Sequence, residues 1–291
     1  MRLTLPPMDL GLVVRSHGWY DLPPFEWDAE KKTLGLIFLE REEPVRVVVA
    51  QRASGLIASA TALSSKGVLR PGAVRQVLSR VLDLKADLSS FHSSCAGDPR
   101  FAWIARRGAG RILRAPTLFE DAVKVLATTN CTWGLTKLMV KNLIERFDRG
   151  GAFPDATFVA GLPARALVAA KFGYRAPYLA AFAGRVASGK LDLARWEEPA
   201  RPDEDVEKEI RAEKGFGPYA ADTLGRLLGR HRKLGLDSWS RKKVAALRFR
   251  GRAVKDARVA RLYAPFDGHA GLAFWLDVSR DWHEEEEGLW P

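Results

Sequence analysis

The hydrophobic pattern of the chain changes its period near Pro71, and this change constrains the fold more than any other feature. Before it, the segments 34–40 and 45–52 are apolar or β-branched and are joined by a short charged turn, which is typical of a β-hairpin. The segment 55–63 is expected to add a further strand. In 74–84 the apolar residues recur at helical spacing, and later segments follow the same pattern. Strands that precede helices, rather than alternate with them, favour an α+β fold over a doubly wound parallel sheet.

We therefore expect a mostly α-helical α+β protein, with a small N-terminal antiparallel β domain over 1–72 and a helical region over 73–291. A chain of 291 residues is long enough to bury a large core. It has two cysteines, Cys95 and Cys131, which exclude a disulfide scaffold and a four-cysteine iron–sulfur cluster. The five histidines show no metal spacing, the sequence has no apolar run of 18 residues, and we expect no signal peptide. We expect a cytoplasmic protein without a cofactor, a metal site or a membrane span.

The positive charge is concentrated in one segment, residues 226–261. This segment holds 13 Lys and Arg but only two acids, Asp237 and Asp256, so its charge of +11 equals that of the whole chain. Clustered cations of this kind are the footprint of a phosphate-binding surface. Nucleic acid is the leading partner, and an anionic membrane surface or a docking protein is the alternative. A basic amphipathic helix with an exposed apolar face, which would favour the membrane, is missing from the sequence.

The segment 203–230 predicts two helices joined by a glycine-rich turn. The turn contains Gly215, Phe216, Gly217 and Pro218. Glycine permits positive φ, and proline suits the first position of the second helix. Backbone N–H groups at such a helix N-terminus can bind a phosphate, while Phe216 is expected to fill the space between the helices. An ordinary helical corner with a glycine C-cap is the alternative interpretation.

Asp237 lies 19 residues after Pro218 and is one of the two acids of the basic segment. A carboxylate beside a bound polyanion can stabilise a developing cation or act as a general base. The alternative role is a helix N-cap, because Ser238 and Ser240 follow closely. The two roles are compatible.

These residues together resemble the helix–hairpin–helix DNA glycosylases, whose signature is a glycine-rich hairpin followed by an aspartate. The stretches 111–147, 172–186 and 268–281 are similar, in the same order, to the 8-oxoguanine DNA glycosylases, so the resemblance covers about 75–281. The N-terminal strands would match the β domain that this branch shares with 3-methyladenine DNA glycosylase II. The resemblance implies a monomer with two helical lobes flanking an active-site cleft. It also implies a nucleoid-associated enzyme whose partner is double-stranded DNA with a damaged base, which it flips out of the duplex.

The resemblance assigns Asp237 as the catalytic carboxylate that stabilises the sugar cation and orients the nucleophile. The hairpin would grip a phosphate, with a monovalent cation possible at its carbonyls. Asn130 would fill the gap left by the flipped base, Tyr174 would act as a wedge, and Arg175 would contact the unpaired partner base. A helix cap for Asn130 and a core aromatic for Tyr174 are the alternatives. The expected DNA-binding residues are Asn130, Tyr174, Arg175, Gly215, Phe216, Gly217, Arg241, Lys242 and Lys243.

The chain departs from the family pattern at two positions. Tyr219 stands where the bifunctional members carry a Schiff-base lysine, which predicts a monofunctional enzyme that uses water. Phe274 replaces an amide that contacts the base in the 8-oxoguanine enzymes. The expected base pocket consists of Tyr219, Trp239, Phe274 and Trp275, whose aromatic faces suit electron-poor alkylated purines. A glycosylase for 8-oxoguanine with an altered pocket, and a non-catalytic protein that binds damaged DNA, remain alternatives.

Overall fold

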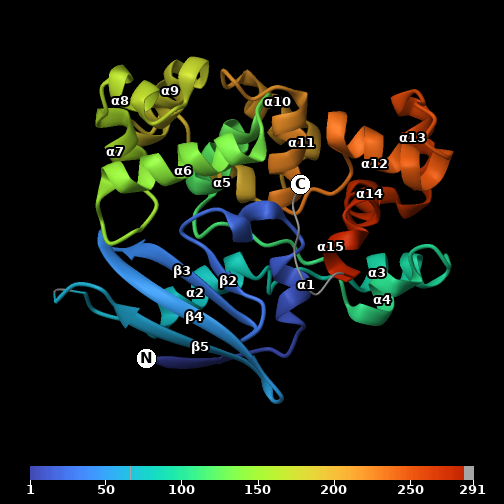
Figure 1. The fold of residues 1–291 in the computed structure, drawn as a ribbon, viewed down its shortest axis with the longest axis horizontal. Coiled ribbons are helices and arrows are strands. Elements are labelled where there is room, and N and C mark those ends of the chain that lie inside the picture. The colour runs from blue at the N-terminus through green and yellow to red at the C-terminus, as the bar shows by residue number, and fades with distance from the viewer. Residues whose placement is uncertain (66, 285–291) are drawn as a thin grey trace.

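A computed structural model describes residues 1–65 and 67–284 (Figure 1). The N-terminal part forms one antiparallel five-stranded sheet of order β1-β5-β4-β3-β2. The strands are β1 (Arg2–Leu5), β2 (Glu26–Asp28), β3 (Thr33–Glu40), β4 (Glu43–Arg52) and β5 (Gly55–Ala62). The three long strands confirm the predicted ones. The short edge strands β1 and β2 were not predicted, because three or four residues carry too little alternation to indicate a strand.

The β3–β4 hairpin shows why this sheet forms. Glu40 pairs with Glu43, so the loop consists of Arg41 and Glu42, both at positive φ as a two-residue hairpin turn requires. Leu36 pairs with Val47, and both side chains are buried on the face that covers the helical core. The alternating apolar residues therefore set the strand register.

All described elements after β5 are helical. The α-helices are α1 (Leu10–Val14), α2 (Pro71–Val81), α3 (Ser89–Ala96), α4 (Ala102–Arg107), α5 (Leu118–Thr128), α6 (Trp133–Phe147), α7 (Ala156–Gly161), α8 (Ala164–Ala169), α9 (Ala176–Ala187), α10 (Asp203–Ala212), α11 (Pro218–Leu227), α12 (Ser238–Phe249), α13 (Asp256–Tyr263), α14 (Ala270–Val278) and α15 (Arg280–Glu284). The 3-10 helices are η1 (Gly18–Asp21), η2 (Gly173–Arg175), η3 (Leu193–Glu197) and η4 (Ala264–His269). Of these helices, α1 and η1 lie between β1 and β2. The α+β prediction is confirmed. Within the described ranges, every helix is too short or too polar to cross a bilayer.

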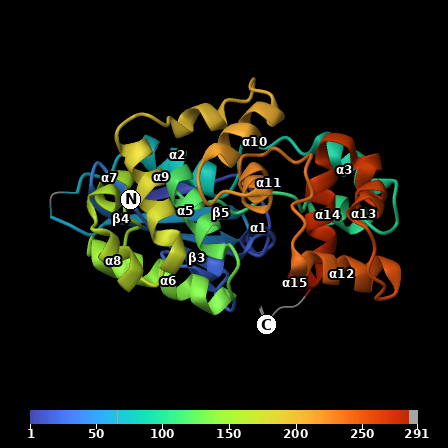
Figure 2. The same cartoon turned by 90° about the horizontal axis from the view of Figure 1, so that it is seen from above.

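The helices form two groups, which Figure 2 shows side by side. One group, α5–α11, lies over the sheet. The other combines α12–α15 with α3 and α4, which come from a distant part of the sequence. Phe101, at the start of α4, packs its ring 4.8 Å from Phe266 and 6.1 Å from Tyr263. The second lobe is thus built from two separate segments, and the domain boundary at 72/73 stays a prediction.

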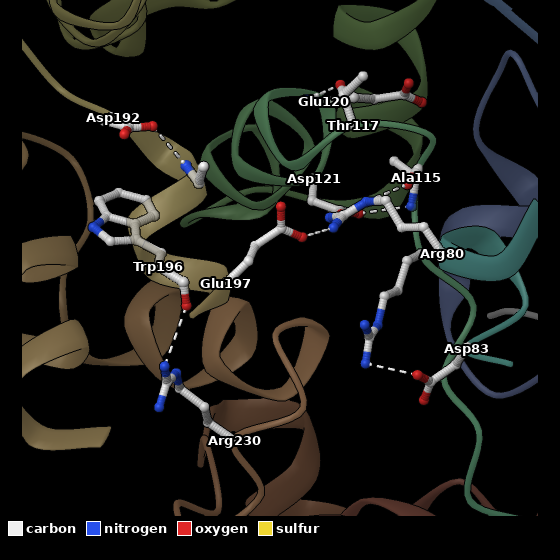
Figure 3. Close-up of polar contacts among 12 residues, drawn as sticks. Arg80, Asp83, Ala115, Thr117, Glu120, Asp121, Asp192, Trp196, Glu197 and Arg230 are labelled. Carbon is white, nitrogen blue, oxygen red and sulfur yellow. Dashed lines mark hydrogen bonds and ion pairs between the residues drawn. The ribbon is translucent and has the colours of Figure 1, made fainter. Parts of the chain in front are cut away.

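A buried polar network fixes the N-terminal segment against the helical core. Asp121 on α5 is fully buried and accepts hydrogen bonds from Trp19 Nε1 at 2.7 Å and from the Ala115 amide at 2.9 Å. Arg80 on α2 donates to the other carboxylate oxygen at 2.6 Å and also pairs with Glu197 (Figure 3). A buried carboxylate needs such partners to remain charged. The network places Trp19 at the centre of the molecule.

Candidate active site

The hairpin between α10 and α11 is shaped by one of its two glycines. Gly215 has φ +93°, and a Cβ there would lie 2.8 Å from Leu126 Cδ1 and 2.9 Å from Tyr178 Cδ2. Gly217 has φ −72°, and a Cβ there would have no neighbour within 4 Å. Only Gly215 therefore uses the positive φ expected of both. Gly217 is the N-cap of α11 and leaves the hairpin open on the side where a phosphate would approach.

Phe216 points away from that open side. Its side chain is 1% exposed, and its ring lies 5.0 Å from the Phe182 ring. The prediction that it fills the space between the helices is confirmed. Its assignment as a DNA-binding side chain is corrected, because a fully buried ring leaves only its backbone to contact a ligand.

Asp237 begins α12 and forms a capping box with Ser240. The Ser240 amide donates to Asp237 Oδ1 at 2.7 Å, and the Asp237 amide donates to Ser240 Oγ at 2.9 Å. The loop before α12 returns Asp237 to the hairpin, so that both line one groove of about 970 Å³. The capping role is thus real, and it fixes the position of the carboxylate at the groove.

Asn130 and Tyr174 line the same groove. Asn130 is exposed at φ +47°, Tyr174 is 54% exposed, and Asn130 Nδ2 lies 3.5 Å from Tyr174 Oη. The structure therefore brings these two predicted residues together at the surface. Arg175 differs: it is 4% exposed and its guanidinium donates to the carbonyl and the hydroxyl oxygen of Thr129. The expectation that it faces a partner base is corrected, because these contacts commit Arg175 to holding the 129–130 loop.

A deeper cavity of about 340 Å³ opens from the groove. The groove and the cavity share four lining residues, which therefore stand at the junction between them. They are Asp237, Tyr219, Thr128 and Cys131. Trp239 and Trp275 line the cavity as predicted. Phe274 is not among its described lining residues.

Phe274 is instead fully buried, with its ring 5.3 Å from the Tyr263 ring. Its predicted place in the base pocket is therefore corrected. Adjacent residues of a helix point about 100° apart, and α14 is oriented so that Trp275 faces the cavity while Phe274 points into the core.

Sequence reasoning missed most of the other residues that line the cavity, among them His17, Trp19 and Arg226. Arg226 could have been found, because it lies two helical turns after Tyr219 on α11 and therefore shares its face. His17 and Trp19 lie some 200 residues earlier in the chain, and only the packing of the N-terminal segment on α5 brings them here.

Comparison of the sequence with family models and with curated proteins finds no match. Comparison of the structure with solved structures finds several matches. MBOgg1 in complex with a low-affinity DNA ligand superposes with a TM-score of 0.75 at 20% identity, covering 96% of this chain and 95% of that one. The 3-methyladenine DNA glycosylase from Archaeoglobus fulgidus gives 0.75 at 16% identity, covering 96% and 98%. The 8-oxoguanine glycosylase/lyase of Clostridium acetobutylicum gives 0.69 at 19%, covering 90% and 93%. The chain has the helix–hairpin–helix DNA glycosylase fold.

Within this glycosylase fold, burial sets the protonation of two cavity residues. Burial raises the pKa of Tyr219, and the negative charge of Asp237 raises it further, so its hydroxyl stays protonated at neutral pH. Burial lowers the pKa of His17 to about 3, with added effects of the Arg226 and Lys124 cations, so its imidazole stays neutral. Among the residues that the structure describes, no three His, Cys, Asp or Glu come together as a metal site.

The basic segment is less uniformly positive at the surface than its sequence indicates. Acids pair with about half of its cations: Asp256 of the same segment pairs with Arg241 at 2.8 Å, and Asp281 from a later segment pairs with Lys243. The ammonium of Lys243 also lies 5.8 Å from the Trp239 ring. The exposed cations that form no ion pair with a described residue are Lys242, Arg250, Arg252, Lys255, Arg258 and Arg261. Exposed pairs are weak, so Arg241 stays available to a phosphate.

A second depression, of about 960 Å³, is lined by other residues, among them Arg80, Asp83 and Glu197, which Figure 3 labels. Four of its charged side chains form two ion pairs: Arg80 pairs with Glu197, and Arg114 Nη2 lies 2.9 Å from Asp83 Oδ1. The two sites have similar volumes but differ in their residues. The groove at Asp237 leads to a cavity, and the Asp237 carboxylate at its mouth forms no ion pair with a described residue.

Proposed function

We propose that the chain is a DNA glycosylase that flips a damaged purine and hydrolyses its N-glycosidic bond. The observation that carries the proposal is the position of Asp237, between a groove faced by the open hairpin and an aromatic cavity of about 340 Å³. That volume is at the lower end of small-molecule sites and fits a single heterocyclic base. Solved structures of the same fold include the Clostridium acetobutylicum enzyme in complex with double-stranded DNA and a Schizosaccharomyces pombe 3-methyladenine glycosylase with abasic DNA.

In the proposed reaction, the hairpin amides at Gly217 bind a phosphate while Tyr174 and Asn130 occupy the space of the extruded nucleotide. The base enters the cavity, and the sugar lies beside Asp237. As the glycosidic bond lengthens, positive charge develops on the sugar, and the carboxylate stabilises it. A water molecule then attacks the sugar carbon, and Asp237 accepts its proton.

The same site argues for a monofunctional enzyme. Tyr219 occupies the junction where a Schiff-base amine would stand, and its protonated phenol cannot form an imine with the sugar. We expect an abasic site as the product, with no strand break until alkali is added. The hairpin carbonyls are oxygen donors that fit a monovalent cation, which would add positive charge beside the bound phosphate.

The test compares wild type, Asp237→Asn and Asp155→Asn in single-turnover reactions on a panel of lesion duplexes. Asp155 caps α7 by accepting the Phe158 amide at 2.8 Å, which makes it a matched control away from the groove. Asparagine is as good an N-cap as aspartate, so both variants should keep wild-type stability within about 0.5 kcal/mol. We expect Asp237→Asn to lose at least about 100-fold in excision rate and the control to lose nothing.

Product that appears only after alkali and only with an intact Asp237 supports the proposal. Breaks without alkali would contradict the monofunctional assignment. Tight binding of lesion DNA without any product would favour the non-catalytic DNA-binding protein.

A further inference from the structure

The cavity holds a cation that its aromatic walls do not suggest. Arg226 is 2% exposed, and its Nη2 donates to the Leu234 carbonyl at 2.9 Å. Its guanidinium carbon lies 4.4 Å from the centre of the Trp275 ring. Gly235 makes this placement possible, because a Cβ there would lie 2.9 Å from Arg226 Nη2. The guanidinium is thus held in one place in the cavity wall.

Arg226 keeps its positive charge and has a hydrogen-bond donor without a partner in the described part of the chain. Burial lowers its pKa to about 10, so it remains a cation at neutral pH. Its buried Nε finds no hydrogen-bond partner in the described part of the chain, and the same holds for Nδ1 of His17. Both residues line the cavity. Buried polar atoms without partners are costly, and a bound base that offers an acceptor would satisfy them.

The cavity has a positive side chain in its wall and a negative side chain at its mouth. Among its described lining residues only Arg226 and Asp237 are charged, and Asp237 stands at the shared mouth. Heterolytic cleavage of a glycosidic bond separates charge in the same sense. The sugar carbon becomes positive, and both bonding electrons go to the ring nitrogen of the departing base.

We propose that Arg226 stabilises the departing base and thereby selects uncharged purines that carry a carbonyl oxygen, such as oxidised or deaminated purines. This proposal rests on the proposed function. An uncharged base leaves as an anion, which the guanidinium attracts until solvent protonates it; water supplies the hydroxyl of the sugar and gives its proton to Asp237. A cationic N-alkylpurine leaves as a neutral molecule. It gains nothing from Arg226 and is repelled by it before cleavage.

Arg226 therefore changes the specificity that the aromatic walls alone indicate. The face of Trp275 that a cationic purine would use already carries the guanidinium. We expect wild type to excise hypoxanthine or 8-oxoguanine about 100-fold faster than N7-methylguanine, relative to the spontaneous loss of each base. N7-methylguanine is the informative comparison, because it carries the carbonyl but also a positive charge.

The test measures single-turnover excision of these bases by wild type, Arg226→Met and Arg226→Lys. We expect Arg226→Met to lose about 100-fold on the uncharged bases and nothing on N7-methylguanine, with partial rescue by Arg226→Lys, which keeps the charge. An equal loss on all bases from a folded variant would overturn the proposal. So would wild-type protein that prefers N7-methylguanine, and this readout needs no variant to fold.

A binding measurement separates this proposal from the proposed function. Duplexes with 2′-fluoro sugars at the lesion resist cleavage, so their affinity reports base selection alone. If wild type excises no base yet binds the hypoxanthine duplex at least about tenfold tighter than the N7-methylguanine duplex, the selection by Arg226 stands and the catalytic function fails. If it excises bases but binds both duplexes equally and shows no rate preference, the selection fails and the function stands.

Discussion

Alanine substitutions at the two hairpin glycines should change different properties: Gly215→Ala should lower the stability, and Gly217→Ala should lower the DNA affinity. Gly215→Ala places a Cβ 2.8 Å from Leu126 Cδ1 and 2.9 Å from Tyr178 Cδ2, at φ +93°. The left-handed backbone costs about 1–2 kcal/mol for a residue with a Cβ, and overpacking typically adds about 1–3 kcal/mol. Because Leu126 and Tyr178 are held by the core and the hairpin, we expect a total loss of about 2–5 kcal/mol in the free energy of unfolding.

Gly217→Ala is the matched control, two residues away in the same hairpin. Its φ of −72° is allowed for alanine, and the new Cβ would meet no atom within 4 Å. Its stability should stay within about 0.5 kcal/mol of wild type. The added methyl group would, however, stand on the side where the proposed phosphate approaches, so DNA affinity should fall.

Urea unfolding monitored by tryptophan fluorescence gives the stability of each variant, and fluorescence anisotropy with a lesion duplex gives its DNA affinity. The expected result is a stability loss confined to Gly215→Ala and, at Gly217→Ala, an affinity loss without a stability loss. A Gly215→Ala protein as stable as wild type would refute the packing argument. A Gly217→Ala protein with unchanged affinity would refute the placement of the phosphate.

Three further predictions concern the wedge, the hairpin core and the response to pH. Tyr174→Ala should weaken binding of lesion duplexes in anisotropy measurements but leave the urea midpoint unchanged, because the side chain is 54% exposed; a shifted midpoint would indicate a structural role. Phe216→Ala should lower the free energy of unfolding by about 3–5 kcal/mol, since its ring is buried against Phe182; a loss below about 1 kcal/mol would contradict the assigned packing. The free energy of unfolding should also fall by about 4 kcal/mol between pH 7 and pH 5, as urea titrations at the two values would measure. Burial lowers the pKa of His17 and His231 to about 3 and that of His283 to about 4. Below pH 6.5 the unfolded chain therefore binds protons at these histidines that the folded chain does not bind. Each histidine lowers the free energy of unfolding by about 2 kcal/mol at pH 5. Glu120 acts oppositely, because burial raises its pKa to about 7, and the stability that it regains between pH 7 and pH 5 is about 2 kcal/mol. Equal stability at both pH values would contradict this reasoning.

Local features of this chain were predictable from its sequence because they depend on residues close together in it. Alternating apolar residues specified the β3–β4 hairpin, and the change to helical spacing specified the helices that follow. The spacing of Asp237 and Ser240 was sufficient for a capping box, because its two hydrogen bonds lie within one turn. Phe216 between two glycines was likewise sufficient to predict a buried plug.

Only the tertiary structure decided which side chains meet at the cavity. His17 and Arg226 line it together, although more than 200 residues separate them. Phe274 and Trp275 are neighbours in the sequence, yet one is buried in the core and the other faces the cavity, because the orientation of α14 is set by its packing. Composition likewise could not show that acids from outside the basic segment pair with Lys243 and Arg248. Periodicity specifies an element, whereas a site requires the relative placement of elements, and that placement is set by the shared core.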